Sequence, residues 1–256
     1  MGTGICHLCK SQCELCQSHA LPHSLFNYVL RQSDGKAIII SDDATTPIQY
    51  SGDSWETNLL CGGCEAKLNR NYDSYGMGVF RGHIALVKRG AAGVTFTNVD
   101  RQRLRMFFLS VLWRISISTH ESYSNSELPY RWEDELHDAL LHERRIPSAR
   151  FTVAVYRLHD STRTLGLTHE NLRGFIMAPF ARECDGLISI CYLFLGFFVE
   201  TFLPRLPKRY ASLPGVLFGR SPVFMAPHHE VLAVPQIMKL LARGLEKHDA
   251  GLSQVG

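Results

Sequence analysis

Apolar residues at helical spacing predict three helices beyond residue 100. The first follows Asp100, a suitable N-cap residue. Its apolar stripe consists of Leu104, Phe107, Phe108, Val111, Leu112 and Ile115. The second helix covers residues 132–143 and ends before Pro147. The third lies near the end of the chain and should cover a sheet with its apolar side, formed by Ile237, Leu240, Leu241 and Leu245.

Alternating or continuous apolar runs predict strands in the remaining segments. A strand is expected at residues 94–99, just before the first of these helices. Residues 151–158, 174–180 and 187–202 should form further strands of one antiparallel sheet. Frequent glycine and proline from residue 204 to 227 predicts turns and one short strand. The adjacent residues His228, His229 and Glu230 are expected in a loop or at a helix start.

The most apolar segment, residues 187–203, is at the short limit for a membrane span. It contains Tyr192, Gly196 and Glu200, so we interpret it as buried strands joined near Gly196. The chain begins without the basic and apolar regions of a secretory signal. We therefore expect a cytoplasmic protein that does not contact a membrane.

Composition and charge narrow the class further. The 256 residues are 45% hydrophobic and 20% charged, which excludes a disordered, collagen-like or coiled-coil chain. The net charge of +3 neither identifies nor excludes a nucleic-acid-binding protein. All of the positive excess lies after residue 150, where Arg205, Lys208 and Arg209 form a candidate phosphate-binding loop. A solvated loop is the alternative for this run of charge.

The cysteines carry the strongest chemical signal. Six of the eight lie in the first 64 residues, as three C-x-x-C pairs. Such pairs in a reducing compartment indicate a zinc site, because two pairs supply four thiolates in tetrahedral geometry. We favour Cys6 and Cys9 with Cys61 and Cys64 as the ligands. The remaining pair, Cys13 and Cys16, is then spare, although a mixed or shifted ligand set stays open.

A helix is predicted to begin at the last cysteine pair. It should cover residues 64–75 and stop before Gly76 and Gly78. Glu65, Asn69 and Asp73 recur every four residues and therefore share one helix face. An oxygen-rich face of this kind suits a hard cation, and an ordinary solvated face is the alternative.

The N-terminal segment resembles the HNH or His-Me finger endonucleases that carry a zinc-stapled treble clef. The resemblance rests on C-x-x-C, then S-H-x-x-P at residues 18–22, then L-L-C-x-x-C-E at residues 59–65. It covers residues 6 to about 76 and extends weakly to about residue 120. No Walker loop, G-x-G-x-x-G or G-x-S-x-G motif points to another chemistry.

The resemblance implies a function and a set of roles. His19 would sit at the end of a short strand and activate water as the general base. The Glu65, Asn69 and Asp73 face would hold a catalytic Mg²⁺ or Mn²⁺. The substrate would be DNA, with RNA also possible, and the protein a bacterial or phage endonuclease, for example in defence against foreign DNA.

The chain departs from the family pattern at two points. Ser18 stands where the family often has an acidic residue or histidine, and the helix lacks a histidine ligand. His7 and His23 could compensate, but one lies within the cysteine pair and the other beyond Pro22. A non-catalytic zinc finger that binds nucleic acid or a protein partner is therefore the alternative function, and a zinc-stabilised subunit of a larger assembly or a homo-oligomer is a further one.

The sequence as a whole thus predicts an α+β protein of two domains. Residues 1–78 would form the zinc-bound treble-clef finger, similar to a ββα-metal unit. Residues 79–256 would form a mixed α+β domain with an antiparallel sheet, which selects the substrate or a partner.

Overall fold

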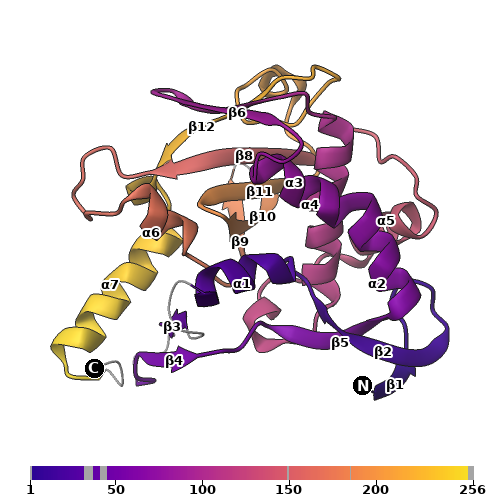
Figure 1. Cartoon of the computed structure of the whole chain (residues 1–256), viewed down its shortest axis with the longest axis horizontal. Helices are drawn as coiled ribbons and strands as arrows, with labels where there is room; N and C mark the ends of the chain where they lie inside the picture. Colours follow the sequence, from indigo (N-terminus) through magenta and orange to yellow (C-terminus); the bar gives the residue numbers. More distant parts are fainter. Residues whose placement is uncertain (1, 32–36, 41–44, 149, 185, 253–256) are drawn as a thin grey trace.

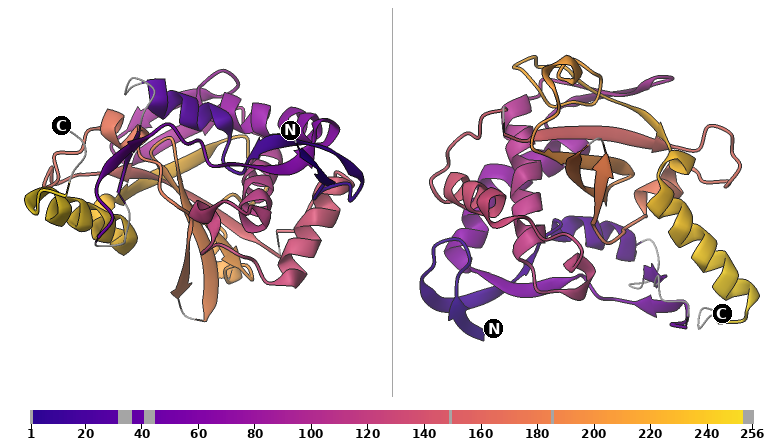
Figure 2. Two further views of the ribbon diagram at one scale, coloured as in Figure 1. Left: turned by 90° about the horizontal axis from the view of Figure 1, so that it is seen from below. Right: turned by 180° about the vertical axis from the view of Figure 1, so that it is seen from behind.

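The structure is a computed structural model in which residues 2–31, 37–40, 45–148, 150–184 and 186–252 are described (Figure 1). It confirms a mixed α+β fold, with a small antiparallel sheet near the N-terminus and a seven-stranded mixed sheet. The two sheets lie at opposite ends of the view in Figure 1, with the helices α1 (His23–Arg31) and α4 (Arg101–Ile117) between them. Seen from below, the N-terminal elements and the strands near residue 190 lie on opposite sides of the molecule (Figure 2).

The small sheet and its first turn hold the first two cysteine pairs and the start of the third. Its strand order is β1 (Gly2–Ile5), β2 (Gln12–His19) and β5 (Glu56–Cys61), and both pairings are antiparallel. The register of β2 against β5 shifts between Cys16 and Gln17. A separate ribbon of two strands, β3 (Ala37–Ile39) and β4 (Gln49–Ser51), lies in the long connection between β2 and β5.

A continuous helical segment follows β5, longer than predicted. It consists of α2 (Gly62–Leu68), the π-helical η1 (Asn69–Asp73) and α3 (Ser74–Phe80). The expectation that Gly76 and Gly78 end the helix is wrong. A Cβ added at Gly76 would lie 2.3 Å from ring carbons of Phe107, so the missing side chain allows α3 to pack closely on α4.

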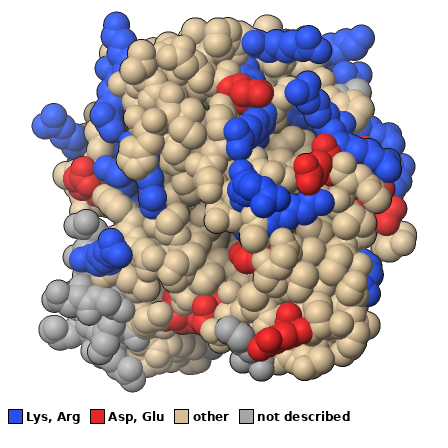
Figure 3. Space-filling model, turned by 45° about the vertical axis from the view of Figure 1, so that its right-hand side comes forward, with Lys and Arg blue, Asp and Glu red and all other residues tan. Residues whose placement is uncertain are grey.

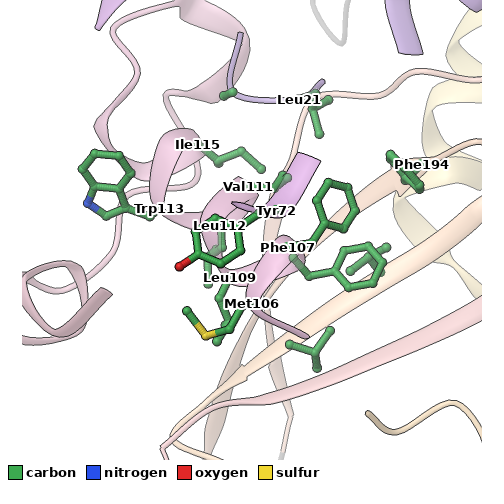
Figure 4. Close-up of a cluster of buried hydrophobic side chains, with 14 of the residues drawn as sticks. Leu21, Tyr72, Met106, Phe107, Leu109, Val111, Leu112, Trp113, Ile115 and Phe194 are labelled. Carbon is green, nitrogen blue, oxygen red and sulfur yellow. The ribbon is translucent and has the colours of Figure 1, made fainter. Parts of the chain in front are cut away.

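Helix α4 is the centre of the core (Figure 4). The side chain of Asp100 caps it, accepting a hydrogen bond from the backbone N–H of Arg103 at 3.0 Å, as predicted. The whole predicted apolar stripe is buried. The helix is buried on its other sides as well, because it lies between the small sheet and the large one. Arg105, which the pattern placed outside the stripe, is also buried and donates to the carbonyl of Ile146.

The large sheet is mixed, not purely antiparallel as predicted. From one edge to the other, its strands are β6 (Leu86–Gly90), β7 (Gly93–Thr97), β12 (Phe224–Glu230), β8 (Thr152–His159), β11 (Phe197–Leu203), β10 (Leu187–Phe194) and β9 (Phe180–Cys184). The β12–β8 pair is parallel, and the other neighbours are antiparallel. β12 returns from the long connection after β11 and inserts beside β8, a placement that strand periodicity does not encode.

Two further strand predictions need correction. The segment 174–180 is not a strand, because α6 (His169–Arg173) precedes it and β9 begins only at Phe180. The segment with His228, His229 and Glu230 is not a loop or helix start but part of β12. The side chains of the two histidines point to opposite faces, as strand geometry requires. His228 packs against His159, and His229 stacks on Phe198.

The apolar run 187–203 forms a hairpin, as predicted. β10 and β11 pair antiparallel on either side of Leu195 and Gly196, and both of these residues have positive φ. Among the helices in the described part of the chain, none is long and apolar enough to cross a bilayer.

The remaining helices cover the edges of the core. α5 (Tyr130–Leu141), close to the predicted range, packs on α4, where the rings of Trp113 and His137 lie 6.0 Å apart; Trp132 packs against Phe151 instead. Short turns of helix occur at η2 (Glu121–Tyr123), η3 (Lys208–Tyr210) and η4 (Val231–Ala233).

The C-terminal helix α7 (Pro235–Asp249) covers the sheet only at its start. Ile237 packs in a small core with Leu158 and Phe198, and the helix then extends away from the sheet towards β3 and β4 (Figures 1 and 2). Leu245, predicted on its apolar side, is 65% exposed.

Candidate metal centre and adjoining cleft

Four cysteines from three elements meet at one point. The Sγ atoms of Cys6, Cys9, Cys61 and Cys64 all lie within 4.8 Å of one another. Cys6 and Cys9 lie in the turn between β1 and β2, Cys61 ends β5, and Cys64 lies in the first turn of α2. These are the four thiols that we favoured from the spacing. The group could hold a metal ion such as zinc, which takes four thiolates in tetrahedral geometry.

The backbone around the cluster is shaped for thiolates. Lys10 adopts a left-handed conformation with φ of 58°, and its N–H donates to the carbonyl of Cys6 at 2.9 Å, which closes the turn. The backbone N–H of Cys61 donates to the Cys6 sulfur at 3.3 Å. Such N–H donors favour the charged sulfur. The fold thus places a backbone donor of the second cysteine pair beside a sulfur of the first.

The protonation of the thiols differs within the cluster. Hydrogen bonds from Ser11 lower the pKa of the Cys9 thiol to about 6. Burial raises the pKa of the Cys64 thiol. A buried thiolate needs a nearby cation, so a bound metal ion would reverse the effect of burial on Cys64 and release its proton.

The second cysteine pair lies outside the group of four. Cys13 and Cys16 are on β2, where the thiol of Cys13 donates to the carbonyl of Ser11 at 3.3 Å. Cys16 lies beside Gly62 and lines a neighbouring cleft. Among the residues the structure describes, no other group of three or more His, Cys, Asp or Glu side chains has metal-binding spacing.

A cleft of about 700 Å³ lies next to the cysteine cluster, and we call it the His19 cleft. It is lined by His19 from the end of β2, by residues of the helical segment α2–η1–α3, and by the start of α1. The predicted residues His19, Glu65, Asn69 and Asp73 all line it. The tertiary structure therefore brings His19 to the helix face that carries the other three, although more than forty positions separate them in the sequence.

His19 is largely buried and its ring is held on one side. Its Nε2 lies 3.1 Å from the hydroxyl of Ser54, 2.9 Å from Nδ1 of His23 and 3.5 Å from a carboxylate oxygen of Glu56. In the described part of the chain, Nδ1 of His19 has no hydrogen-bond partner. Burial, with the charges of His23 and Arg114, lowers the pKa of His19 to about 4. The imidazole is therefore neutral at physiological pH.

Glu65 and Ser18 are joined directly. The Ser18 hydroxyl is buried and donates to a carboxylate oxygen of Glu65 at 2.9 Å. Ser18 precedes His19 on β2, while Glu65 lies on α2. The departure from the family pattern at Ser18 thus leaves a hydroxyl oxygen beside the Glu65 carboxylate.

The other two residues of the predicted helix face have partners of their own. Asn69 accepts a hydrogen bond from Ser74 at 3.1 Å. Both carboxylate oxygens of Asp73 accept from the guanidinium of Arg114, at 2.6 and 2.8 Å. Burial alone would lower the pKa of Arg114, but the Asp73 carboxylate outweighs it and the net shift is upward. Arg114 also donates to the carbonyl of His19 at 3.3 Å, so this ion pair supports the end of β2.

The sequence analysis gave too little weight to His23 and did not identify Arg81 and His83 as residues that line the cleft. His23 opens α1 and reaches back to His19, while Arg81 and His83 follow α3 and line the far side of the cleft. The pattern of Leu25, Phe26 and Val29, all buried, is the signal that could have revealed α1. No local motif marks Arg81 or His83.

The predicted phosphate-binding loop, with Arg205, Lys208 and Arg209, lies outside the His19 cleft. Lys208 and Arg209 are exposed in η3, and the guanidinium of Arg209 lies 4.8 Å from the ring centre of Tyr210. Neither they nor Arg205 line the His19 cleft.

Comparisons of the chain with protein-family models, with curated proteins and with solved structures give no match.

Proposed function

We propose that this protein is a metal-dependent endonuclease of the HNH or His-Me finger type, which hydrolyses phosphodiester bonds of DNA. The observation that carries the proposal is the position of His19. It ends β2 and faces a cleft opposite Glu65, in the first helical turn after β5. The cysteine cluster beside it joins the β1–β2 turn to that helix. The order of turn, hairpin, strand and helix, with a cysteine pair at each end, supports a treble clef.

His19 is suited to the role of general base. Its Nε2 is held among Ser54, His23 and Glu56, which orients the ring. Nδ1 is the nitrogen left for a water molecule. The ring is neutral and can accept a proton, and a bound phosphate raises its pKa because negative charge favours the imidazolium. Proton transfer to His19 would then accompany attack of water on phosphorus.

The oxygens on α2 and η1 fit a divalent cation in part. The Glu65 carboxylate, held by the Ser18 hydroxyl, and the Asn69 amide would hold Mg²⁺ or Mn²⁺, which prefer oxygen ligands. Such an ion, when bound, supplies charge neutralisation to the phosphoryl oxygens and the leaving group. Asp73 fits this role less well, because both of its oxygens are paired with Arg114. Asp73 instead positions the end of β2 through Arg114.

Plasmid cleavage tests the proposal. We expect the zinc-loaded protein to nick plasmid DNA with Mg²⁺ or Mn²⁺, and His19→Ala to be slower by about 100-fold or more, as for loss of a general base. His142→Ala, which removes an exposed histidine that follows α5 and does not line the His19 cleft, should cut like the parent protein. Zinc content by elemental analysis must be equal in all three. Cleavage by zinc-loaded His19→Ala at the parent rate would contradict the role of His19.

The second candidate function is a non-catalytic zinc module that binds nucleic acid or a protein. The pairing of Asp73 with Arg114 favours it, because one of the three predicted cation ligands is already neutralised. Dependence on a second, exchangeable divalent ion separates the two functions. If the folded, zinc-loaded protein fails to cut DNA both with Mg²⁺ and with Mn²⁺, the result would support the non-catalytic module.

A further inference from the structure

A second, larger cleft adjoins the His19 cleft. Its volume is about 1010 Å³, and the two clefts share Ser24, Arg81 and His83 in their linings. Its walls come from α1, the end of α3, the β6–β7 hairpin, β8, α6 and β12. The two clefts therefore meet at Arg81, whose guanidinium donates to the carbonyl of Ser24 at 3.2 Å.

The lining of this second cleft is strongly basic. It contains one acidic residue, Glu170, and five arginines, namely Arg31, Arg81, Arg89, Arg157 and Arg173, and we call it the arginine cleft. Glu170 accepts a hydrogen bond from Tyr28 at 3.1 Å and lies 3.8 Å from Arg173. The face drawn in Figure 3 shows Lys and Arg side chains mainly on its upper half, the half that holds the large sheet in Figure 1.

Arg157 forms a buried cationic site within the arginine cleft. It is 6% exposed, and one guanidinium nitrogen donates to the carbonyl of Leu195 at 2.8 Å. Gly196, with φ of 76°, lets the β10–β11 turn approach it, since a Cβ there would lie 2.5 Å from that nitrogen. In the described part of the chain no carboxylate lies within 4 Å of this guanidinium. Burial, with the charges of Arg173 and Arg89, lowers the pKa of Arg157 to about 10.

A buried guanidinium without a counterion is destabilising, and an anion that enters the cleft would compensate it. Arginine presents planar pairs of N–H donors that match phosphate oxygens. We propose that the arginine cleft binds the backbone phosphates of the DNA strand that is cut in the His19 cleft, with Arg157 as the deep contact and Arg89 and Arg173 at the opening. The choice of DNA as the ligand rests on the proposed endonuclease function.

This proposal differs from the sequence prediction, which placed phosphate contacts on the loop with Arg205, Lys208 and Arg209. Those side chains line neither cleft. The loop therefore offers a matched control, because the same loss of charge can be made there and in the arginine cleft.

Direct binding of DNA tests the proposal. The His19→Ala protein, which is expected to cut at least about 100-fold more slowly, is titrated into a fluorescently labelled 20-base-pair duplex without added Mg²⁺ or Mn²⁺, at several salt concentrations. Arg89→Gln with Arg173→Gln should bind about 10-fold more weakly at moderate salt. It should also reduce the slope of log affinity against log salt by about 1.8, since each phosphate contact contributes about 0.9. Arg205→Gln with Arg209→Gln should bind like the His19→Ala protein. Circular dichroism and zinc content verify folding of each variant.

The outcomes separate this proposal from the endonuclease itself. Unchanged affinity in the arginine-cleft variant, weaker binding only in the loop variant, or no DNA binding at all would each overturn the arginine cleft as the phosphate site. If the parent protein nicks plasmid DNA but the arginine-cleft variant binds DNA with normal affinity, only the proposal for the arginine cleft is overturned. If the arginine-cleft variant binds DNA more weakly but the parent protein never nicks DNA, only the proposed endonuclease function is overturned.

Discussion

At the scale of single residues, His19 combines burial with a crowded Nε2. Its side chain is 12% exposed, and the groups near Nε2 include both a second histidine and a carboxylate. The Asp73–Arg114 ion pair lies directly behind it and holds its carbonyl. Removing either partner of such a buried pair leaves an uncompensated charge, so the pair is a structural support for the end of β2 that carries His19.

The pKa of His19 leads to a prediction about stability and pH. The pKa is about 4 in the folded chain and about 6.5 in the unfolded one, so between these values the unfolded chain binds more protons. The contribution of His19 is therefore fully present above pH 6.5 and is lost as the pH falls towards 4. Between pH 7.5 and 5 we expect a loss of about 1 to 2 kcal/mol in the free energy of unfolding.

Urea denaturation at several pH values measures this effect. His19→Asn should lose less stability on acidification than the parent protein by that amount. His83→Asn removes another histidine of the cleft but leaves His19 in place, so it should keep the parent's pH dependence. Identical pH dependence of His19→Asn and the parent would show that His19 is not held neutral in the fold.

At the scale of elements, the helical segment from α2 to α3 links the cysteine cluster to the core. It starts at the cysteine pair, carries Glu65 and Asn69 along the His19 cleft, and packs α3 against α4. The π-helical turns at η1 lie where Asp73 meets Arg114. The close packing of α3 on α4 depends on glycine.

Gly76→Ala is predicted to destabilise the protein. The new Cβ would lie 2.3 Å from the ring of Phe107, which is fully buried and cannot move aside. We expect a loss of about 1 to 3 kcal/mol, measured by thermal or urea denaturation. Gly63→Ala is the matched control, because a Cβ there meets no atom within 4 Å and alanine favours a helix. Equal stability of Gly76→Ala and the parent would contradict the observed packing.

At the scale of the whole molecule, the cysteine cluster and the core are connected. The main core includes Cys6 and Cys64, the residues of α4, and Phe224 in the large sheet. The predicted boundary between residues 78 and 79 stays a prediction, and α3 runs across that position. Residues of the N-terminal elements and of later parts of the chain line both clefts, so the proposed function and the packing of the core depend on the same contacts.

Loss of the metal should therefore destabilise the molecule. Cys61→Ser, or treatment with a strong chelator, is expected to remove zinc and lower the free energy of unfolding by at least about 3 kcal/mol. Cys13→Ser changes a thiol outside the cluster and should keep one zinc ion per chain with normal stability. Elemental analysis and thermal denaturation make the comparison. Loss of zinc from Cys13→Ser, with retention in Cys61→Ser, would indicate the shifted ligand set.

Local patterns determined much of what the sequence predicted correctly. The C-x-x-C spacing identified the four thiols, and the stripe after Asp100 identified α4 and its cap. These signals are local, because two ligands on one turn and an apolar face on one helix need only nearby residues. The same holds for the hairpin across Gly196, where a turn residue separates two apolar runs.

Only the tertiary structure decided the rest. Whether Gly76 stops a helix or permits close packing depends on Phe107, and the insertion of β12 beside β8 depends on contacts between distant segments. The arginine cleft draws its charges from four separate elements and from the turn after α3, none of which has a notable run of charge. Residues far apart in the sequence acquire a shared environment only when the chain folds, so the pairing of Asp73 with Arg114 and the burial of Arg157 have no local signature.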